Sequence, residues 1–263
     1  MKLLRRLLKL QLLIGHVLIG LLLAWLLFSL RLPLSTHWSS MIVSGWSRQL
    51  CRIVGLQIRC YGHIATTPTL FVANHISWLD IFALLGTFPV IFVAKQEVAK
   101  WPILGRLTRQ VGTLFIQRGQ FQAAAATANQ MSQALLNHKN VLFFPEGTSS
   151  EGVGVKRFHA RLFQAAIQAG VPVQPIALRY PQNEDINRVV PYIGEDVFIN
   201  HVWRVLGETK LTVELWFGPP VASKNKERRE LADYAQQQIL TQLQQQHQTF
   251  SYPLPNNLNI TLN

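Results

Sequence analysis

The feature that most constrains the fold is an apolar segment near the N-terminus, which runs from residue 10 to residue 30. As an α-helix it would be about 30 Å long, enough to cross the hydrocarbon core of a bilayer. Four basic residues precede it, namely Lys2, Arg5, Arg6 and Lys9. The segment therefore predicts a membrane-embedded helix in front of whatever the rest of the chain forms.

A secretory signal peptide is the competing interpretation of this segment. Signal peptides end at a cleavage site of the Ala-x-Ala kind, whereas Arg31-Leu32-Pro33 follows here. One membrane crossing with the basic end inside would place the remaining chain outside the cytoplasm. A second helical stretch follows, in which Ile42, Trp46 and Leu50 share one face. Two helices that turn at Pro33 would return the chain to its starting side, so we expect a monotopic or hairpin anchor.

A histidine and an aspartate lie at a predicted strand-to-helix turn. Residues 69–73 form a short apolar run typical of a buried strand, and the apolar residues 81–85 indicate a helix. On a continuous helix, His75 and Asp80 would point about 140° apart, so they can meet only if His75 precedes the first turn. A carboxylate beside a histidine is suited to removing a proton from a hydroxyl. The ends of parallel strands are also where α/β sheets place their chemistry.

A structural interpretation of the same residues stays open. Ser77 and Asp80 fit the Ser-x-x-acid capping box, in which Asp80 would satisfy backbone amides. Asp80 could also cap the helix and orient His75 at once. We expect Ser77 to be a cap rather than a nucleophile, and the chain has no Gly-x-Ser-x-Gly elbow.

Four ordered blocks resemble the glycerolipid acyltransferase family, whose bacterial members include 1-acyl-glycerol-3-phosphate acyltransferases. The blocks are Asn74-His75-x4-Asp80, residues 112–118, residues 144–148 and residues 171–177, with further matches at residues 94–97, Pro102 and Gly105. The resemblance covers roughly residues 50 to 220. It implies an α/β fold, with a mixed sheet flanked by helices behind an N-terminal membrane-embedded helical hairpin.

The resemblance also implies a reaction. His75 would be the general base that deprotonates the acceptor hydroxyl as it attacks an acyl thioester, and Asp80 would fix the histidine tautomer. The acyl donor would be acyl-CoA or acyl carrier protein, with no further cofactor and no covalent acyl-enzyme. The acceptor would be the free hydroxyl of 1-acyl-sn-glycerol-3-phosphate, and the product phosphatidate.

By the same resemblance, a set of residues would bind the acceptor. Lys95 and Arg118 would hold its anionic head, because lysine supplies a point charge and arginine a planar fork. Their alternative interpretation is as ordinary surface cations. Glu146, Gly147 and Thr148 would shape the site: Gly147 would permit a tight turn, and Glu146 would bind either a substrate hydroxyl or a neighbouring arginine.

One departure from the family pattern leaves the acceptor open. The third block usually continues with an arginine, whereas Ser149 and Ser150 follow here, and then the pair Glu151-Gly152. Lyso-ornithine-lipid acyltransferases resemble the chain in this respect, so lyso-ornithine lipid is the alternative acceptor. The nearby cations of residues 156–161 could compensate for the missing arginine. A non-catalytic membrane-binding protein is the third hypothesis.

Composition agrees with work at a membrane surface. The net charge of +12 implies an anionic partner. We expect membrane lipids rather than nucleic acid, because no nucleic-acid-binding motif occurs. The histidines and cysteines lack zinc-ligand spacing, so we expect no metal. We predict anchoring helices over residues 1–55, a catalytic domain over 56–250 that faces the cytoplasm from the inner membrane, and a flexible tail over 251–263.

Overall fold

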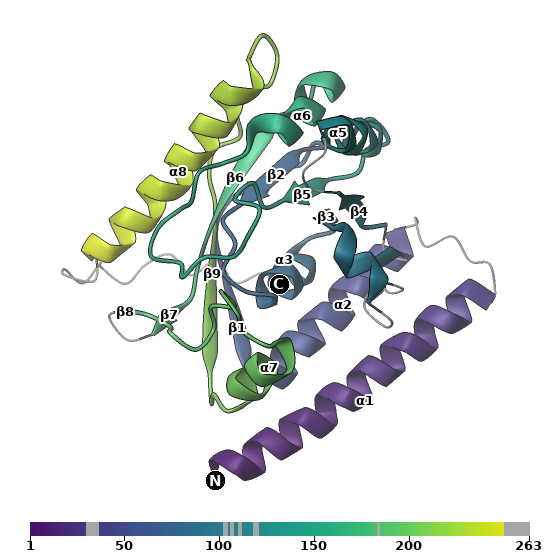
Figure 1. Ribbon diagram of the computed structural model, residues 1–263, viewed down its shortest axis with the longest axis vertical. Helices are drawn as coiled ribbons and strands as arrows, with labels where there is room; N and C mark the ends of the chain where they lie inside the picture. The colour runs from purple at the N-terminus through teal and green to yellow at the C-terminus, as the bar shows by residue number, and fades with distance from the viewer. Residues whose placement is uncertain are drawn as a thin grey trace.

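The computed structural model describes residues 1–29, 37–101, 105, 108–109, 112–117, 121–182 and 185–249. Within them, a seven-stranded sheet of order β1-β9-β6-β2-β5-β3-β4 forms the centre of the molecule (Figure 1). Neighbouring strands are parallel except β6 and β9, which run antiparallel. The strands are β1 (Leu56–Gly62), β2 (Leu70–Ala73), β3 (Ile91–Lys95), β4 (Leu114–Ile116), β5 (Val141–Phe143), β6 (Val173–Arg179) and β9 (Leu211–Phe217). The predicted mixed α/β fold is therefore confirmed.

Helices cover both faces of this sheet, which gives a three-layer arrangement. One hydrophobic cluster joins the sheet to α2 (His37–Val54), α3 (Leu79–Thr87) and α7 (Phe198–Leu206). The second cluster joins the opposite face to α5 (Phe121–Leu136), α6 (Gln164–Ala169) and α8 (Arg228–Thr249). The short helices η1 (Gln96–Lys100) and η2 (Ala160–Phe163), and the hairpin of β7 (Pro181–Gln182) and β8 (Asp185–Ile186), complete these elements.

The central strands explain why the sequence has continuous apolar runs. All four residues of β2 and all seven of β6 are buried, because each strand is covered on both faces. Apolar or alternating runs predict strands not only at residues 69–73 but also near residues 113–117, 141–144, 171–177 and 211–217. These five strands are present as β2, β4, β5, β6 and β9. The sequence also predicts helices over the Ala- and Gln-rich residues 121–138 and the polar residues 227–248, and these are present as α5 and α8.

The N-terminal helix α1 (Lys2–Ser29) packs against α2 and α7 (Figure 1). The Lys9 ammonium donates hydrogen bonds to the Val54 and Glu208 carbonyls, both at 2.7 Å. Further along the helix, the His16 ring stacks on Trp46 with centroids 4.6 Å apart. These polar residues face the domain, whereas many leucines of α1 are exposed. The helix therefore lies along the α/β domain and presents its apolar side outward.

The length and composition of α1 fit a membrane helix. Among the described residues it is the one helix apolar enough to cross a membrane, over Lys2–Leu26. The turn expected at Pro33 lies outside the described residues, as does the predicted tail 251–263. At the other end of the predicted anchor, α2 ends at Val54 and β1 begins at Leu56.

Candidate active site

The segment between β2 and α3 wraps around the carboxylate of Asp80. His75 lies just beyond the end of β2, and Asp80 is the second residue of α3. The His75 Nδ1 atom lies 2.8 Å from Asp80 Oδ2, which also accepts the backbone N–H groups of Ile76 at 2.7 Å and Ser77 at 3.0 Å. The structure therefore brings the two predicted catalytic residues together.

The burial of this pair fits a base that faces a substrate. Asp80 is fully buried, whereas the His75 side chain is 21% exposed. An ionised carboxylate only accepts hydrogen bonds, so the contact with Asp80 places the histidine proton on Nδ1. The lone pair of the neutral imidazole is then on Nε2, the atom that would take a proton from an acceptor hydroxyl. The ring of Phe144 stacks on the imidazole with centroids 4.0 Å apart, which holds its plane.

The expected cap at Ser77 is wrong. Trp78 is the N-cap residue of α3 and makes no side-chain capping hydrogen bond. The Ser77 hydroxyl is buried and has no hydrogen-bond partner among the described residues. The part of the expectation that concerns Asp80 is confirmed, because its carboxylate accepts the amides of the turn and contacts the His75 ring at the same time. The turn therefore wraps around the Asp80 carboxylate that contacts His75.

Two further residues complete the surroundings of Asp80, namely Tyr180, which the sequence did not single out, and Asn74, which the first sequence block contains but to which no role was assigned. The Tyr180 hydroxyl donates a hydrogen bond to Asp80 Oδ1 at 2.6 Å. Burial, and then the Asp80 charge, raise the pKa of Tyr180 well above its ordinary value. The Asn74 side chain donates to the Leu178 carbonyl and accepts from the Leu178 N–H, both at 2.8 Å. These bonds fix the end of β6, and with it Tyr180, beside the catalytic turn.

Glu146 supports the histidine through the main chain. Its Oε1 atom accepts the His75 N–H at 2.9 Å, and its Oε2 atom accepts the Lys156 N–H at 2.9 Å. Burial raises the pKa of the Glu146 carboxyl, and the two backbone hydrogen bonds oppose this shift. The described structure thus shows two backbone contacts where the sequence led us to expect a substrate hydroxyl or an arginine. Gly147 has a positive φ of 71°, as the expected tight turn requires.

Ser149 and Ser150, which stand where the family pattern usually has an arginine, bind backbone carbonyls around His75. The Ser150 N–H and hydroxyl both donate to the His75 carbonyl, at 2.8 and 3.1 Å. The Ser149 hydroxyl donates to the Tyr192 carbonyl, and the Lys156 ammonium donates to the Ser149 carbonyl at 2.9 Å. Ser149 therefore offers no cation, but Lys156 brings one close to the position where the family has an arginine.

The other expected binding residues lie around this centre. Lys95 is the last residue of β3, and its side chain is exposed. Since β2, β5 and β3 are parallel neighbours, Lys95 lies at the same edge of the sheet as His75 and Glu146. Thr148 is exposed in the turn that follows Gly147. Arg118 lies outside the described residues.

The residue types gathered here suit proton transfer to and from an organic hydroxyl. Among the described residues, no group of three or more histidine, cysteine, aspartate or glutamate side chains is placed to hold a metal ion. A partly exposed histidine, a buried carboxylate and nearby cations suit the activation of a hydroxyl on an anionic or zwitterionic molecule.

Comparisons with known proteins agree with this chemistry. Residues 57–179 match the family model described as Acyltransferase. The chain is 36% identical over 239 residues to the lyso-ornithine lipid O-acyltransferase of Pseudomonas aeruginosa, with 90% of this chain and 92% of that protein covered. It is also 36% identical over 187 residues to the 1-acyl-sn-glycerol-3-phosphate acyltransferase of Neisseria gonorrhoeae, with 71% and 73% covered.

A solved structure shows the same fold. The crystal structure of the 1-acyl-sn-glycerophosphate acyltransferase from Thermotoga maritima superposes with a TM-score of 0.67 at 19% identity, and covers 93% of this chain and 97% of that one. At this identity the likeness concerns the fold alone. The sequence relatives carry the assignment further, since one of them aligns over nearly its whole length at 36% identity. The chain belongs to the glycerolipid acyltransferase family.

Proposed function

We propose that this protein transfers an acyl chain from acyl-CoA or acyl carrier protein to the free hydroxyl of 1-acyl-sn-glycerol-3-phosphate, which gives phosphatidate. The observation that carries the proposal is the contact between His75 Nδ1 and the buried Asp80 carboxylate. His75 Nε2 takes the hydroxyl proton as the oxygen attacks the thioester carbonyl. The tetrahedral intermediate then expels the thiolate, which receives a proton from the imidazolium.

No covalent acyl-enzyme is needed in this scheme, because the nucleophile belongs to the acceptor. Asp80 stabilises the imidazolium that forms during the attack, as the acid does in a serine-protease triad. The Ser77 hydroxyl is buried beneath the turn, which supports its exclusion as a nucleophile.

The acceptor phosphate would be bound by cations at the rim of the site. Lys95 is exposed at the edge that holds His75, and Arg118 follows β4, the strand that pairs with β3. Lys156 adds a third positive charge next to Ser149. Such cations suit a phosphate, with which lysine and arginine form charge-assisted hydrogen bonds.

Lyso-ornithine lipid is the second candidate acceptor, and two observations favour it. Ser149 occupies the place of an arginine and binds a backbone carbonyl instead. The relative that aligns over 90% of the chain is named for this lipid. Acyl transfer to either acceptor would use the same His75 and Asp80.

The cellular location forms part of the proposal. The outward apolar side of α1 fits insertion into lipid, and acyl-CoA and acyl carrier protein are cytoplasmic. We therefore place the catalytic domain on the cytoplasmic side of the inner membrane, with α1 and α2 as its anchor.

The test is acyl transfer by the detergent-purified protein, offered lysophosphatidate and lyso-ornithine lipid in parallel with each donor. The wild type is compared with His75→Ala. Turnover of lysophosphatidate that is lost in the variant is the expected result. Turnover of lyso-ornithine lipid alone would move the assignment to the second acceptor. No turnover with either lipid and either donor would overturn the proposal and favour a membrane-binding protein.

A further inference from the structure

We propose that Tyr180 is a positioning residue of the catalytic relay, the hydrogen-bonded pair of His75 and Asp80. Its hydroxyl orients the Asp80 carboxylate and sets how strongly that carboxylate accepts the hydrogen bond from His75. The inference rests on the proposed function, because it assigns a role at the same site. Tyr180 lies outside the four sequence blocks and touches Asp80 rather than a substrate.

The two oxygens of Asp80 have different partners. Oδ2 accepts the His75 ring and the two backbone amides of the turn, whereas Oδ1 accepts the Tyr180 hydroxyl at 2.6 Å. An ionised carboxylate cannot donate, so the phenol is the donor in this contact. Tyr180 thereby withdraws negative charge from the acid and fixes the rotation of its carboxyl group.

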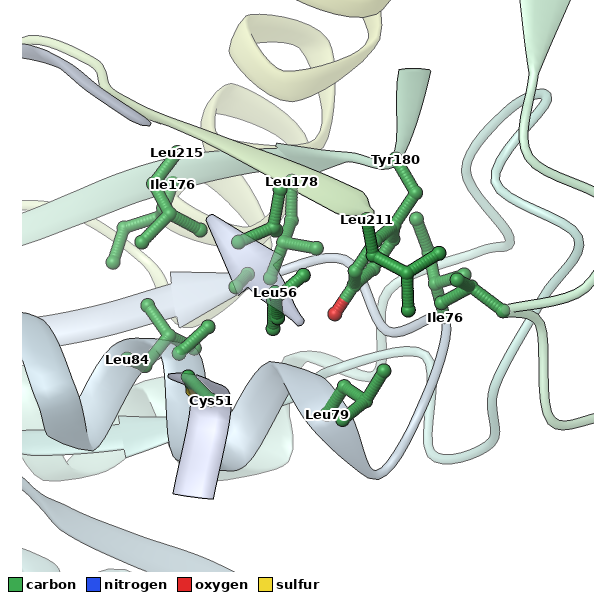
Figure 2. Close-up of a cluster of buried hydrophobic side chains, with 14 of the residues drawn as sticks. Cys51, Leu56, Ile76, Leu79, Leu84, Ile176, Leu178, Tyr180, Leu211 and Leu215 are labelled. Atoms are coloured by element: carbon green, nitrogen blue, oxygen red, sulfur yellow. The ribbon is translucent and has the colours of Figure 1, made fainter. Parts of the chain in front are cut away.

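The surroundings of the phenol make this contact strong. Tyr180 is 2% exposed, and its ring lies among apolar side chains such as Ile76, Leu79 and Leu211 (Figure 2). Hydrogen bonds to a charged group are worth more in such a region than in water, because no solvent competes. Without the phenol, Asp80 Oδ1 would face an apolar cluster.

The position of Tyr180 is itself fixed from both sides. The Asn74 side chain holds Leu178, two residues before it, and the Tyr180 carbonyl accepts the Asn187 N–H at 2.8 Å. The hydroxyl therefore has a defined place from which to act on Asp80. A tyrosine that only filled the core would not need this alignment.

The effect on the reaction has a definite sign. When the phenol is removed, the full carboxylate charge faces the imidazole, so the imidazolium that forms in the reaction is stabilised more strongly relative to the neutral ring. The titratable groups around the Tyr180 hydroxyl are Asp80 from α3, His75, which binds the other oxygen of Asp80, and the buried Cys51 thiol from α2. A stronger phenol donor must have the opposite effect.

The experiment compares Tyr180→Phe with Tyr234→Phe. Tyr234 lies on α8, where its hydroxyl donates to the Pro219 carbonyl, so the control loses the same atom far from the site. For Tyr180→Phe we expect kcat to fall by about ten- to hundredfold with KM little changed, since a misplaced relay costs rate rather than binding. The acid side of the pH–rate profile should move to higher pH. A rate and a profile that match those of Tyr234→Phe would overturn the inference.

A second measurement covers a variant that does not fold. Difluorotyrosine at position 180 keeps the shape and donates more strongly, so the acid side of the profile should move to lower pH, and an unmoved profile contradicts the proposal. The His75 Nδ1–H proton resonance, assigned by its loss in His75→Ala, provides a readout without turnover. It should move upfield with difluorotyrosine. The two proposals can fail separately. If the wild type transfers no acyl chain, the proposed function is wrong. If the His75 resonance does not move with difluorotyrosine, the role of Tyr180 is wrong.

Discussion

The carboxylate of Glu146 accepts the backbone N–H of His75 at 2.9 Å, so the acid of the third sequence block holds the proposed base by its main chain. Its other oxygen binds the Lys156 N–H and thereby fixes the loop that follows. Glu146 thus joins two segments that lie far apart in the sequence, and in the proposed mechanism their alignment places His75 against the acceptor.

Replacement of Glu146 by glutamine tests this link. One acceptor oxygen becomes an NH2 group, which faces a backbone N–H instead of accepting from it. Loss of a buried hydrogen bond costs about 1 to 3 kcal/mol, so we expect a lower free energy of unfolding and a kcat reduced by about tenfold or more. The measurements are denaturant unfolding and steady-state kinetics. Glu151→Gln changes an exposed carboxylate of the same loop and should leave both unchanged. Wild-type kcat in Glu146→Gln would contradict the role.

Replacement of Asp80 by asparagine should affect catalysis more than folding. Asparagine retains one acceptor oxygen but carries no charge to stabilise the imidazolium or to select the Nδ1–H tautomer. We expect kcat to fall by about 10²- to 10⁴-fold, in the range for loss of general-base catalysis. Circular dichroism should show an intact fold. Asp185→Asn, whose side chain is 65% exposed, is the control. A loss of less than tenfold in Asp80→Asn would argue against His75 as the base.

A buried histidine outside the relay predicts a pH dependence of stability. His201 accepts the Trp78 indole N–H at 3.0 Å on Nδ1, and its Nε2 atom lies 3.0 Å from the Val190 carbonyl. Burial, followed by the Arg204 charge, lowers the pKa of His201, whereas Asp196 raises it. The unfolded chain then takes up this proton first as the pH falls. The stabilising contribution is therefore complete above about pH 6.5 and is lost as the pH falls toward the lower folded value.

The check is the melting temperature of wild type and His201→Gln at about pH 7.5 and about pH 5.5, on either side of the ordinary histidine value. The variant should be less stable at the higher pH and should lose less on acidification. His63→Gln, at an exposed histidine, should behave as the wild type does. An equal loss on acidification in His201→Gln and wild type would refute the assignment.

The sequence predicted the parts of the molecule that depend on local pattern. The central strands were found because strands covered on both faces are continuously apolar, and the pair His75 and Asp80 was found by its spacing at a strand end. The edge strand β1 was missed because one face is exposed, so that Gln57 and Arg59 interrupt its apolar residues. The strand β3 and the short helix α7 were also not predicted from their patterns.

The support of the site depends on contacts between distant segments, which local pattern does not report. Tyr180 contacts Asp80 across 100 residues, and Glu146 contacts His75 across 71. Tyr180 and Glu146 are each a single polar side chain near the end of a predicted strand. Many polar residues at such positions are ordinary surface groups, so their position in the sequence does not reveal these contacts. The capping box at Ser77 was half right, since Asp80 accepts the Ser77 N–H as the pattern requires, whereas the Ser77 hydroxyl makes no capping hydrogen bond.

The last prediction concerns how α1 is held to the catalytic domain. The Lys9 ammonium binds the last carbonyl of α2 and the Glu208 carbonyl beyond α7, so one side chain joins three helices. In Lys9→Met the aliphatic length remains but both hydrogen bonds are lost. Hydrogen bonds from a charged donor contribute about 1.5 to 3 kcal/mol each, so α1 should separate more readily from the domain.

Hydrogen exchange of the α1 amides in detergent should be faster in Lys9→Met than in the wild type, and the melting temperature should fall. Lys210→Met removes an exposed lysine near the same contact and should change neither quantity. Binding to lipid vesicles should persist in Lys9→Met, because the outward leucines of α1 are unchanged. Unaltered exchange in α1 would show that the apolar contacts with α2 and α7 hold the helix without Lys9.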